Sequence, residues 1–286
     1  MVDSGSPTSD SFSQIKPRHT VKNANGGSTK HGASMKDPSL KQRFDRDGYL
    51  LDLPLLTHSQ VNHARRAYER LEAETIRRNP KGRITNAHHS DPEFWNLATG
   101  HRVMELVETL IGPNIVLLST GFFAKAPNTD EKFVAWHQDT TYWGLEPPFA
   151  VTVWIAIDDS TIENGCMRVI PGSHHKGLLP HGTSDREGNV LGQNQEIDPS
   201  LFDSSTAVDF VLKAGRSSVH HGLLIHGSNP NCSSRRRVGM TARFCTPDVK
   251  PVKDGPYPFV DRALLVHGED RFDHFDYAPT PAFATS

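Results

Sequence analysis

Cysteine is scarce in this sequence. Only three of the 286 residues are cysteines, Cys166, Cys232 and Cys245. Their number is odd, and their spacing fits no metal site. We therefore expect a reduced, intracellular protein rather than one held together by disulfides.

Long apolar runs and an excess of one charge are missing as well. No continuous apolar run reaches the roughly 18 residues that a transmembrane helix needs. The first residues, MVDSGSPTSDSFSQ, have neither the basic start nor the apolar segment of a signal peptide. The formal net charge of -2 gives no whole-chain argument for binding nucleic acid. We expect a cytoplasmic protein with no membrane or nucleic-acid partner.

Turn-forming residues, in contrast, are plentiful. The chain has 22 glycines and 20 prolines, which suits a turn-rich β protein better than a helical bundle. Residues 1–36 are rich in Ser, Gly, Asn, Lys and Thr and contain almost no large apolar residue. Such a segment cannot bury enough surface to offset its ordering entropy, so a flexible tail is predicted. Residues 37–286 are predicted to form a single domain.

Helices are expected in the first part of this domain. Thr57 or Ser59 can cap one helix, and Ser90 or Asp91 can cap another that has a proline in its first turn. The predicted segments are a short helix and strand over residues 37–56 and helices over 57–78, 90–98 and 101–112.

The pattern of residue types along the sequence changes after residue 112. Short β-branched or aromatic runs such as NIVLLSTGFF, FAVTVWIAI and RVGMTARFC alternate with Gly, Pro, Asn and Asp. Runs of this kind are typical of an all-β sandwich or barrel. The predicted fold class is mainly β, with N-terminal helices packed on a β-sandwich.

Sixteen histidines are the one compositional hint of metal chemistry. The pattern His-x-Asp, expected roughly once by chance, occurs at residues 89–91, 137–139 and 274–276. Helix capping accounts for Asp91, and surface hydrogen bonding is the simpler role for His274. His137 and Asp139 lie where a strand pattern ends, and alternation places both on one face.

A third ligand has to come from another strand. The segment GRSSVHHGLLIHGSNPN offers three histidines, and alternation puts His220 and His226 on one face and His221 on the other. Two histidines and one carboxylate form the facial triad of non-haem Fe(II) oxygenases. Zinc hydrolases also use mixed sets of histidine and carboxylate. The ligand identities therefore leave both metals open.

The arginines after His226 help to separate the two metals. Arg235, Arg236 and Arg237 begin the next predicted strand, which returns beside His226 if it is antiparallel. A triple run rarely points inward as a whole, so two of the three are expected in solvent. One inward arginine can bind a carboxylate through two hydrogen bonds. This favours a carboxylate co-substrate, which zinc hydrolysis does not need.

Several ordered blocks resemble one family. WHQDTTYW, WIAIDDSTIENGCMRVIPGSHHKG and LLIHGSNPNCSSRRRVGMTARF strongly resemble the phytanoyl-CoA dioxygenase family of Fe(II)- and 2-oxoglutarate-dependent oxygenases, over roughly residues 40 to 275. The resemblance implies a double-stranded β-helix, or jelly roll, with a metal at its open end. It also implies an iron triad of His137, Asp139 and His226.

The co-substrate and substrate positions follow from the same resemblance. It places Arg237 on the distal carboxylate of 2-oxoglutarate, with Ser228 beside it and with Lys125 and Thr152 on the opposing sheet. Halogenases of the family replace the triad carboxylate with a small residue, so Asp139 argues against halogenation. Residues that follow the triad directly are candidates for contacting the substrate: Thr140, Tyr142 and Trp143.

The activity implied is hydroxylation of an unactivated C–H of a small molecule. It would consume O2 and 2-oxoglutarate, release succinate and CO2, and use ascorbate as the reductant in vitro. Desaturation or epoxidation by the same chemistry stays open, and so do a metallohydrolase and a non-catalytic jelly-roll binding protein. The expected oligomeric state is a monomer or a homodimer.

Overall fold

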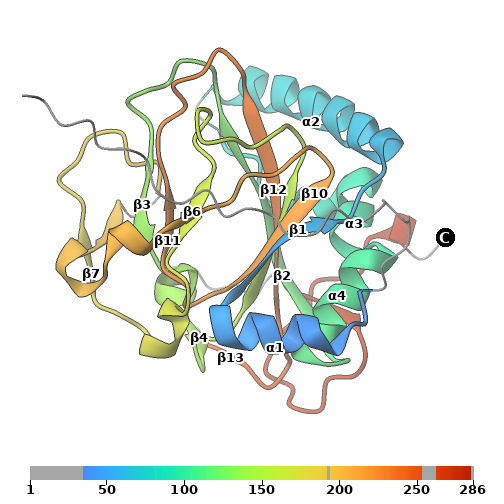
Figure 1. Ribbon diagram of the computed structural model, residues 1–286. Helices are drawn as coiled ribbons and strands as arrows, with labels where there is room; N and C mark the ends of the chain where they lie inside the picture. Colours follow the sequence, from blue (N-terminus) through green and yellow to red (C-terminus); the bar gives the residue numbers. More distant parts are fainter. Residues whose placement is uncertain (1–34, 81, 192–193, 253–261, 285–286) are drawn as a thin grey trace, which may run out of the picture. The chain divides into compact units, whose positions relative to one another are not determined.

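The structure, a computed structural model, describes residues 35–80, 82–191, 194–252 and 262–284 (Figure 1). All of these residues lie in one unit of the chain, Met35–Ser286. The predicted flexible tail falls outside the described residues except for its last two, of which Met35 is buried in the main apolar core.

The helices lie in the predicted segments. Thr57 accepts a hydrogen bond from the backbone N–H of Gln60, whose side chain in turn accepts from the backbone N–H of Thr57, which closes a capping box. Asp91 caps another helix by accepting from the backbone N–H of Glu93. The α-helices are α1 (Pro38–Asp47), α2 (His58–Arg78), α3 (Pro92–Thr99) and α4 (His101–Ile111). Short 3-10 helices are η1 (Ala87–His89), η2 (Asp139–Tyr142), η3 (Ser173–Lys176), η4 (Pro199–Leu201), η5 (Ser204–Thr206) and η6 (Ala282–Ala284).

A six-stranded sheet is the larger of two that matter for function. Its strand order is β1-β10-β5-β12-β2-β14, and we call it the large sheet. Its strands are β1 (Tyr49–Pro54), β10 (Arg216–His221), β5 (Val151–Ala156), β12 (Arg237–Cys245), β2 (Ile115–Lys125) and β14 (Leu264–His267).

A four-stranded sheet, which we call the small sheet, has the order β3-β11-β6-β9. Its strands are β3 (Val134–His137), β11 (His226–Ser228), β6 (Met167–Val169) and β9 (Val208–Asp209). Two further strand pairs are β13 (Lys250–Pro251) with β4 (Leu145–Glu146) and β7 (His181–Thr183) with β8 (Gln195–Ile197).

Strand alternation divides the large sheet into an apolar and a polar face. Val153 and Ile155 of β5 and Met240 of β12 belong to the main core cluster, together with residues of the helices such as Phe94 and Leu106. Each fully buried side chain of this size contributes about 1.5–3 kcal/mol. Figure 1 shows α2, α3 and α4 on this side of the sheet and β3, β6 and β11 on the other. The opposite face of the large sheet is thereby free to carry polar groups.

All pairs of named strands are antiparallel. Two antiparallel sheets with helices against the larger one confirm the predicted mainly β, jelly-roll fold class. Among the described helices, none combines the length and the apolar character needed to span a bilayer.

Candidate metal and co-substrate site

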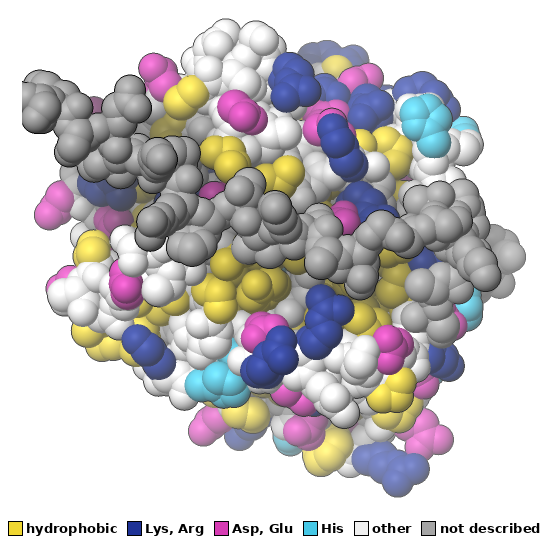
Figure 2. All heavy atoms as spheres, viewed as in Figure 1, with side chains coloured by type: hydrophobic (Ala, Val, Ile, Leu, Met, Phe, Trp, Pro, Cys, Tyr) yellow, Lys and Arg dark blue, Asp and Glu magenta, His cyan; other side chains and the backbone are white. Residues whose placement is uncertain are grey.

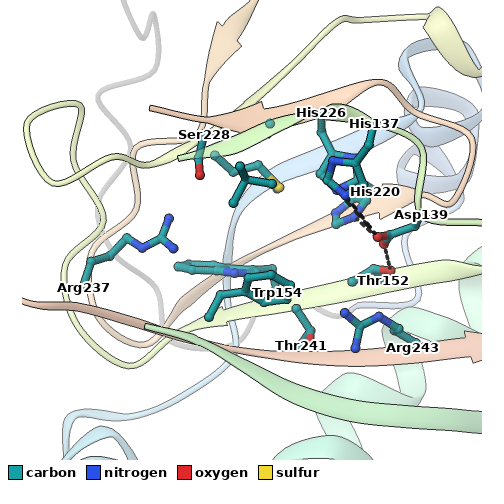
Figure 3. A pocket seen from close by; sticks show the side chains of 14 residues that line it. His137, Asp139, Thr152, Trp154, His220, His226, Ser228, Arg237, Thr241 and Arg243 are labelled. Atoms are coloured by element: carbon teal, nitrogen blue, oxygen red, sulfur yellow. Dashed lines mark hydrogen bonds and ion pairs between the residues drawn. The ribbon is translucent and has the colours of Figure 1, made fainter. Parts of the chain in front are cut away.

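A pocket lies between the polar face of the large sheet and the small sheet (Figure 3). At one end, the sequence-predicted ligands come together. His137 ends β3, Asp139 begins η2 and His226 begins β11, and one ligand atom from each lies within 4.8 Å of the others. The two histidines are register partners across the β3–β11 pair.

The triad side chains are oriented by the backbone. The Nδ1 atoms of His137 and His226 lie 2.9 Å from the carbonyl oxygens of Ala135 and Leu224, respectively. A carbonyl can only accept, so each Nδ1 carries the proton and each Nε2 keeps its lone pair. Metal-binding histidines usually have this arrangement. The Nε2 atoms lie 3.6 and 3.8 Å from Asp139 Oδ1, so the donor set fits a divalent metal ion.

The second oxygen of Asp139 is held by the large sheet. Its Oδ2 accepts a hydrogen bond of 3.0 Å from Thr152 Oγ1 and lies 3.3 Å from His220 Nε2. Thr152 and His220 are register partners across the β5–β10 pair. The carboxylate therefore presents Oδ1 to the two ligand histidines while Oδ2 is fixed.

The electrostatics favour the protonation states that bind a metal. Burial opposes ionisation of Asp139, but the hydrogen-bonding neighbours His137 and His220, with His226 and the charge of Arg243 nearby, outweigh it and hold the pKa of the carboxyl well below its usual range. Burial, with His137 and His220 nearby, lowers the pKa of His226. A carboxylate and a neutral imidazole are the forms that coordinate.

Two cationic side chains lie at the other end of the pocket. Arg237, the first residue of β12, is the register partner of Lys125 at the end of β2. Arg237 Nη1 donates to the carbonyl of Gly165 at 2.7 Å, whereas its Nε has no hydrogen-bond partner in the part of the chain that the structure describes. Lys125 Nζ donates to Ser228 Oγ at 2.7 Å and to the carbonyl of Asn229.

These cations have no carboxylate partner among the ion pairs of the described residues. Burial lowers the pKa of Arg237 to about 10, and burial with the charge of Arg237 lowers the pKa of Lys125 to about 7. Uncompensated buried charge is costly. This end of the pocket is therefore suited to an anion.

The other two arginines of the run point away, as predicted. Arg235 is exposed, and Arg236 pairs with Asp158 at 3.0 Å and Glu69 at 2.9 Å. Thr152 lines the pocket beside Asp139 at the triad end, and its contact with the co-substrate remains a prediction.

The three residues expected to contact the substrate do not line the pocket within the described part of the chain. Thr140 is buried, 3.3 Å from the carbonyl of Gly222. The ring of Tyr142 lies 6.1 Å from that of His181, and that of Trp143 lies 5.2 Å from the guanidinium of Arg243. β3 ends at His137 and the chain turns into η2, so Thr140 and Tyr142 point elsewhere, whereas Trp143 lies beside the pocket residue Arg243. Their contact with a substrate remains a prediction.

Sequence reasoning missed three polar residues of the pocket, His220, Thr241 and Arg243. Alternation did place His220 on the face of His226, although the two lie in different sheets, with ring centroids 4.6 Å apart. Arg243 follows Arg237 by six residues on β12. The same alternation that brings Arg237 inward carries Arg243 inward, and this was the available signal.

Comparison with known proteins agrees with this geometry. Residues 44–239 match the family model described as phytanoyl-CoA dioxygenase (PhyH). The chain belongs to this family. As a phytanoyl-CoA dioxygenase family member it is an Fe(II)- and 2-oxoglutarate-dependent dioxygenase, which confirms the enzyme class, the iron and the 2-oxoglutarate expected from the sequence.

Individual members of the phytanoyl-CoA dioxygenase family are moderately similar. The peroxisomal phytanoyl-CoA dioxygenase of Bos taurus is 28% identical over 72% of this chain and 68% of its own length. Phytanoyl-CoA dioxygenase domain-containing protein 1 of Bos taurus is 30% identical over 75% and 69%. The structure of ThoJ, a non-heme monooxygenase, matches with a TM-score of 0.70 and 31% identity over 85% and 88%. The expected cytoplasmic location and oligomeric state remain predictions.

Proposed function

We propose that this protein hydroxylates an unactivated C–H of a small molecule, with His137, Asp139 and His226 holding Fe(II). One observation carries the proposal. A buried triad that presents two Nε2 atoms and one Oδ1 atom to one another shares a pocket with a buried arginine whose Nε has no hydrogen-bond partner among the described residues. Arg237 would bind the distal carboxylate of 2-oxoglutarate, with Ser228 and Lys125 beside it.

When bound, the metal and 2-oxoglutarate supply the oxidation, in which O2 converts 2-oxoglutarate to succinate and CO2 while one oxygen atom enters the substrate. The protein residues orient these groups. Thr152 and His220 fix the second oxygen of Asp139, and the backbone carbonyls of residues 135 and 224 fix the ligand histidines. Lining residues such as Trp154 and Met167 keep the pocket largely apolar between its two polar ends.

Insertion of an oxygen atom is favoured over desaturation by the likeness to ThoJ, which is described as a monooxygenase. The product mass separates desaturation, which removes two hydrogens, from hydroxylation and epoxidation, which both add an oxygen atom, and NMR of the product separates the last two. Hydrolysis has less support, because it makes no use of the buried cations at the far end of the pocket.

The direct test is succinate formation under air with Fe(II), ascorbate and 2-oxoglutarate. We expect slow succinate release by the wild type and its loss in His137→Ala and Arg237→Ala. Arg235→Ala is the matched control, because Arg235 lies in the same run but is exposed, and it should keep the wild-type rate. Equal succinate from wild type and both pocket variants would refute the assignment of these residues.

A further inference from the structure

Arg243 is a second pocket arginine with no role in the proposed binding of iron and 2-oxoglutarate. It lies on the same face of β12 as Arg237, and Figure 3 shows Trp154 and Thr241 between the two arginines. Trp154 fits there because it packs on Gly239, where a Cβ would come within 1.9 Å of the indole ring. The two arginines therefore serve different ends of the pocket.

The partners that Arg243 has do not neutralise it. Its guanidinium lies 5.2 Å from the ring centroid of Trp143 and 6.0 Å from that of Phe123. Its Nε is buried and has no hydrogen-bond partner among the described residues. Among the ion pairs of the described residues there is none that includes Arg243. Burial lowers its pKa, and the charge of Asp139 offsets this only in part.

Asp139 has no oxygen to spare for Arg243. Its Oδ1 faces the two ligand histidines, and its Oδ2 is held by Thr152 and His220. A guanidinium stacked on aromatic rings keeps its N–H groups free in the ring plane. Arg243 is therefore a hydrogen-bond donor that the protein itself leaves unsaturated.

A charge count indicates what the donor binds, given the proposed function on which it rests. A divalent metal and Asp139 sum to one positive charge, and Arg237 adds a second. The two negative charges of 2-oxoglutarate cancel both. Arg243 then leaves one positive charge in the pocket, and Lys125, when protonated, adds to it. Arg243 is half-buried and its Nε is shielded from water, so a surplus of this kind is costly unless an anion joins it.

We propose that Arg243 binds a carboxylate of the substrate, so that the substrate is a small organic acid. A carboxylate supplies the single negative charge required and matches the fork of a guanidinium. The rings of Phe123 and Trp143 provide apolar surface beside it. The site would hold the acid at the triad end of the pocket, with Arg237 left to the co-substrate.

Binding measurements without turnover test this directly. The protein is loaded with Fe(II) without oxygen and saturated with 2-oxoglutarate, so that the Arg237 end is filled. Straight-chain monocarboxylates from acetate to octanoate are then titrated by calorimetry, each against its neutral primary amide. We expect at least one acid to bind about tenfold more tightly than its amide, and Arg243→Gln to abolish the difference, as for loss of a charged hydrogen bond.

Two variants and one further titration make the result decisive. Arg243→Lys should keep part of the preference for the acid, and it replaces Arg243→Gln if that variant melts early. The affinity for 2-oxoglutarate should stay within about twofold of wild type in both variants, about 0.4 kcal/mol. Failure of wild type to bind 2-oxoglutarate would refute the proposed function itself, independently of the acid–amide comparison.

Two outcomes would overturn the role of Arg243. A loss of 2-oxoglutarate affinity in Arg243→Gln, without an effect on the acids, would assign the arginine to the co-substrate. Equal binding of every acid and its amide by wild type would leave Arg243 as a support for the Trp143 ring.

Discussion

The two sheets around the pocket contribute different chemistry. The small sheet and the turn after β3 provide the three candidate metal ligands, whereas the large sheet provides the cations Lys125, Arg237 and Arg243. The large sheet is anchored by the main core and its helices, whereas the small sheet packs on minor clusters around residues such as Phe210 and Phe202. Figure 2 shows one face of the molecule, on which Lys and Arg side chains lie interspersed with Asp and Glu side chains. The pocket differs from this surface, because its cations have no acidic side chain paired with them among the described residues.

This difference has a physical reason. Burying an unpaired guanidinium costs several kcal/mol before an anion arrives, so it requires a rigid, well-packed support. Neutral histidines cost less, and backbone carbonyls two residues away suffice to orient them. If this division holds, metal binding and anion binding should be separable by mutation.

Removing the carboxylate ligand should have the largest effect. Asp139→Ala takes away one of three ligands and leaves Thr152 and His220 without their acceptor, so metal affinity should fall by more than about 100-fold, beyond the 10–100-fold typical of residues that only orient ligands. Titration with a competing chelator measures this. Asp276→Ala is the matched control, because Asp276 belongs to another His-x-Asp but is exposed. A similar loss in both would contradict the assignment.

Arg237→Met should weaken 2-oxoglutarate binding by about 10–100-fold, because it removes charged hydrogen bonds from a buried site. Metal affinity should stay at the wild-type value, since Arg237 contributes nothing to the triad end. Calorimetry on the metal-loaded protein reports both quantities, with Arg235→Met as the exposed control. A parallel fall in metal affinity would contradict the division of metal binding and anion binding between the two sheets.

His220→Phe tests the same division of roles at a residue that lies between them. His220 belongs to the large sheet but contacts the candidate metal ligand Asp139 from across the pocket. Losing its hydrogen bond to Asp139 should weaken metal binding by about tenfold and leave 2-oxoglutarate affinity nearly unchanged. His221→Phe is the control. That ring packs against Phe149 and Phe44 instead, so its loss should change the melting temperature and not metal affinity.

The smallest expected effect is on pH dependence. The pKa of Lys125 is about 7, so its positive charge is present below that pH and is lost as the pH rises. Affinity for the 2-oxoglutarate dianion should therefore be greatest near pH 6 and decline by about 3- to 10-fold toward pH 9. In Lys125→Met the affinity should be lower at pH 6 and flat with pH. A flat wild-type profile would remove Lys125 from the anion site.

Local signals and strand alternation were enough to predict much of this structure. The caps at Thr57 and Asp91 come from short-range chemistry, and α2 and α3 begin where these signals indicate. The pairing of His137 with His226 came from their sequence context together with the family resemblance. Its geometry, adjacent strands with register-paired histidines, agrees.

Other features depend on contacts that a sequence does not show. The segment between β10 and β11 turns the chain from the large sheet to the small one, so strand alternation could not predict that His220 meets Asp139 from across the pocket. Thr140, Tyr142 and Trp143 were expected near the substrate because of their proximity to Asp139. The turn into η2 places Thr140 near Gly222 and Tyr142 near His181, and leaves Trp143 beside Arg243. Whether each arginine after His226 is exposed or buried likewise depends on the acidic residues of other elements.

The visible charge-transfer band of an Fe(II)–2-oxoglutarate complex tests the central claim most directly. Fe(II) and 2-oxoglutarate are added to the protein without oxygen, and spectra of wild type, His226→Ala and Arg237→Met are compared at equal concentrations. We predict a band in wild type, none in His226→Ala, and one in Arg237→Met only at much higher 2-oxoglutarate. A wild type that binds Fe(II) but gives no band at saturating 2-oxoglutarate would contradict the claim.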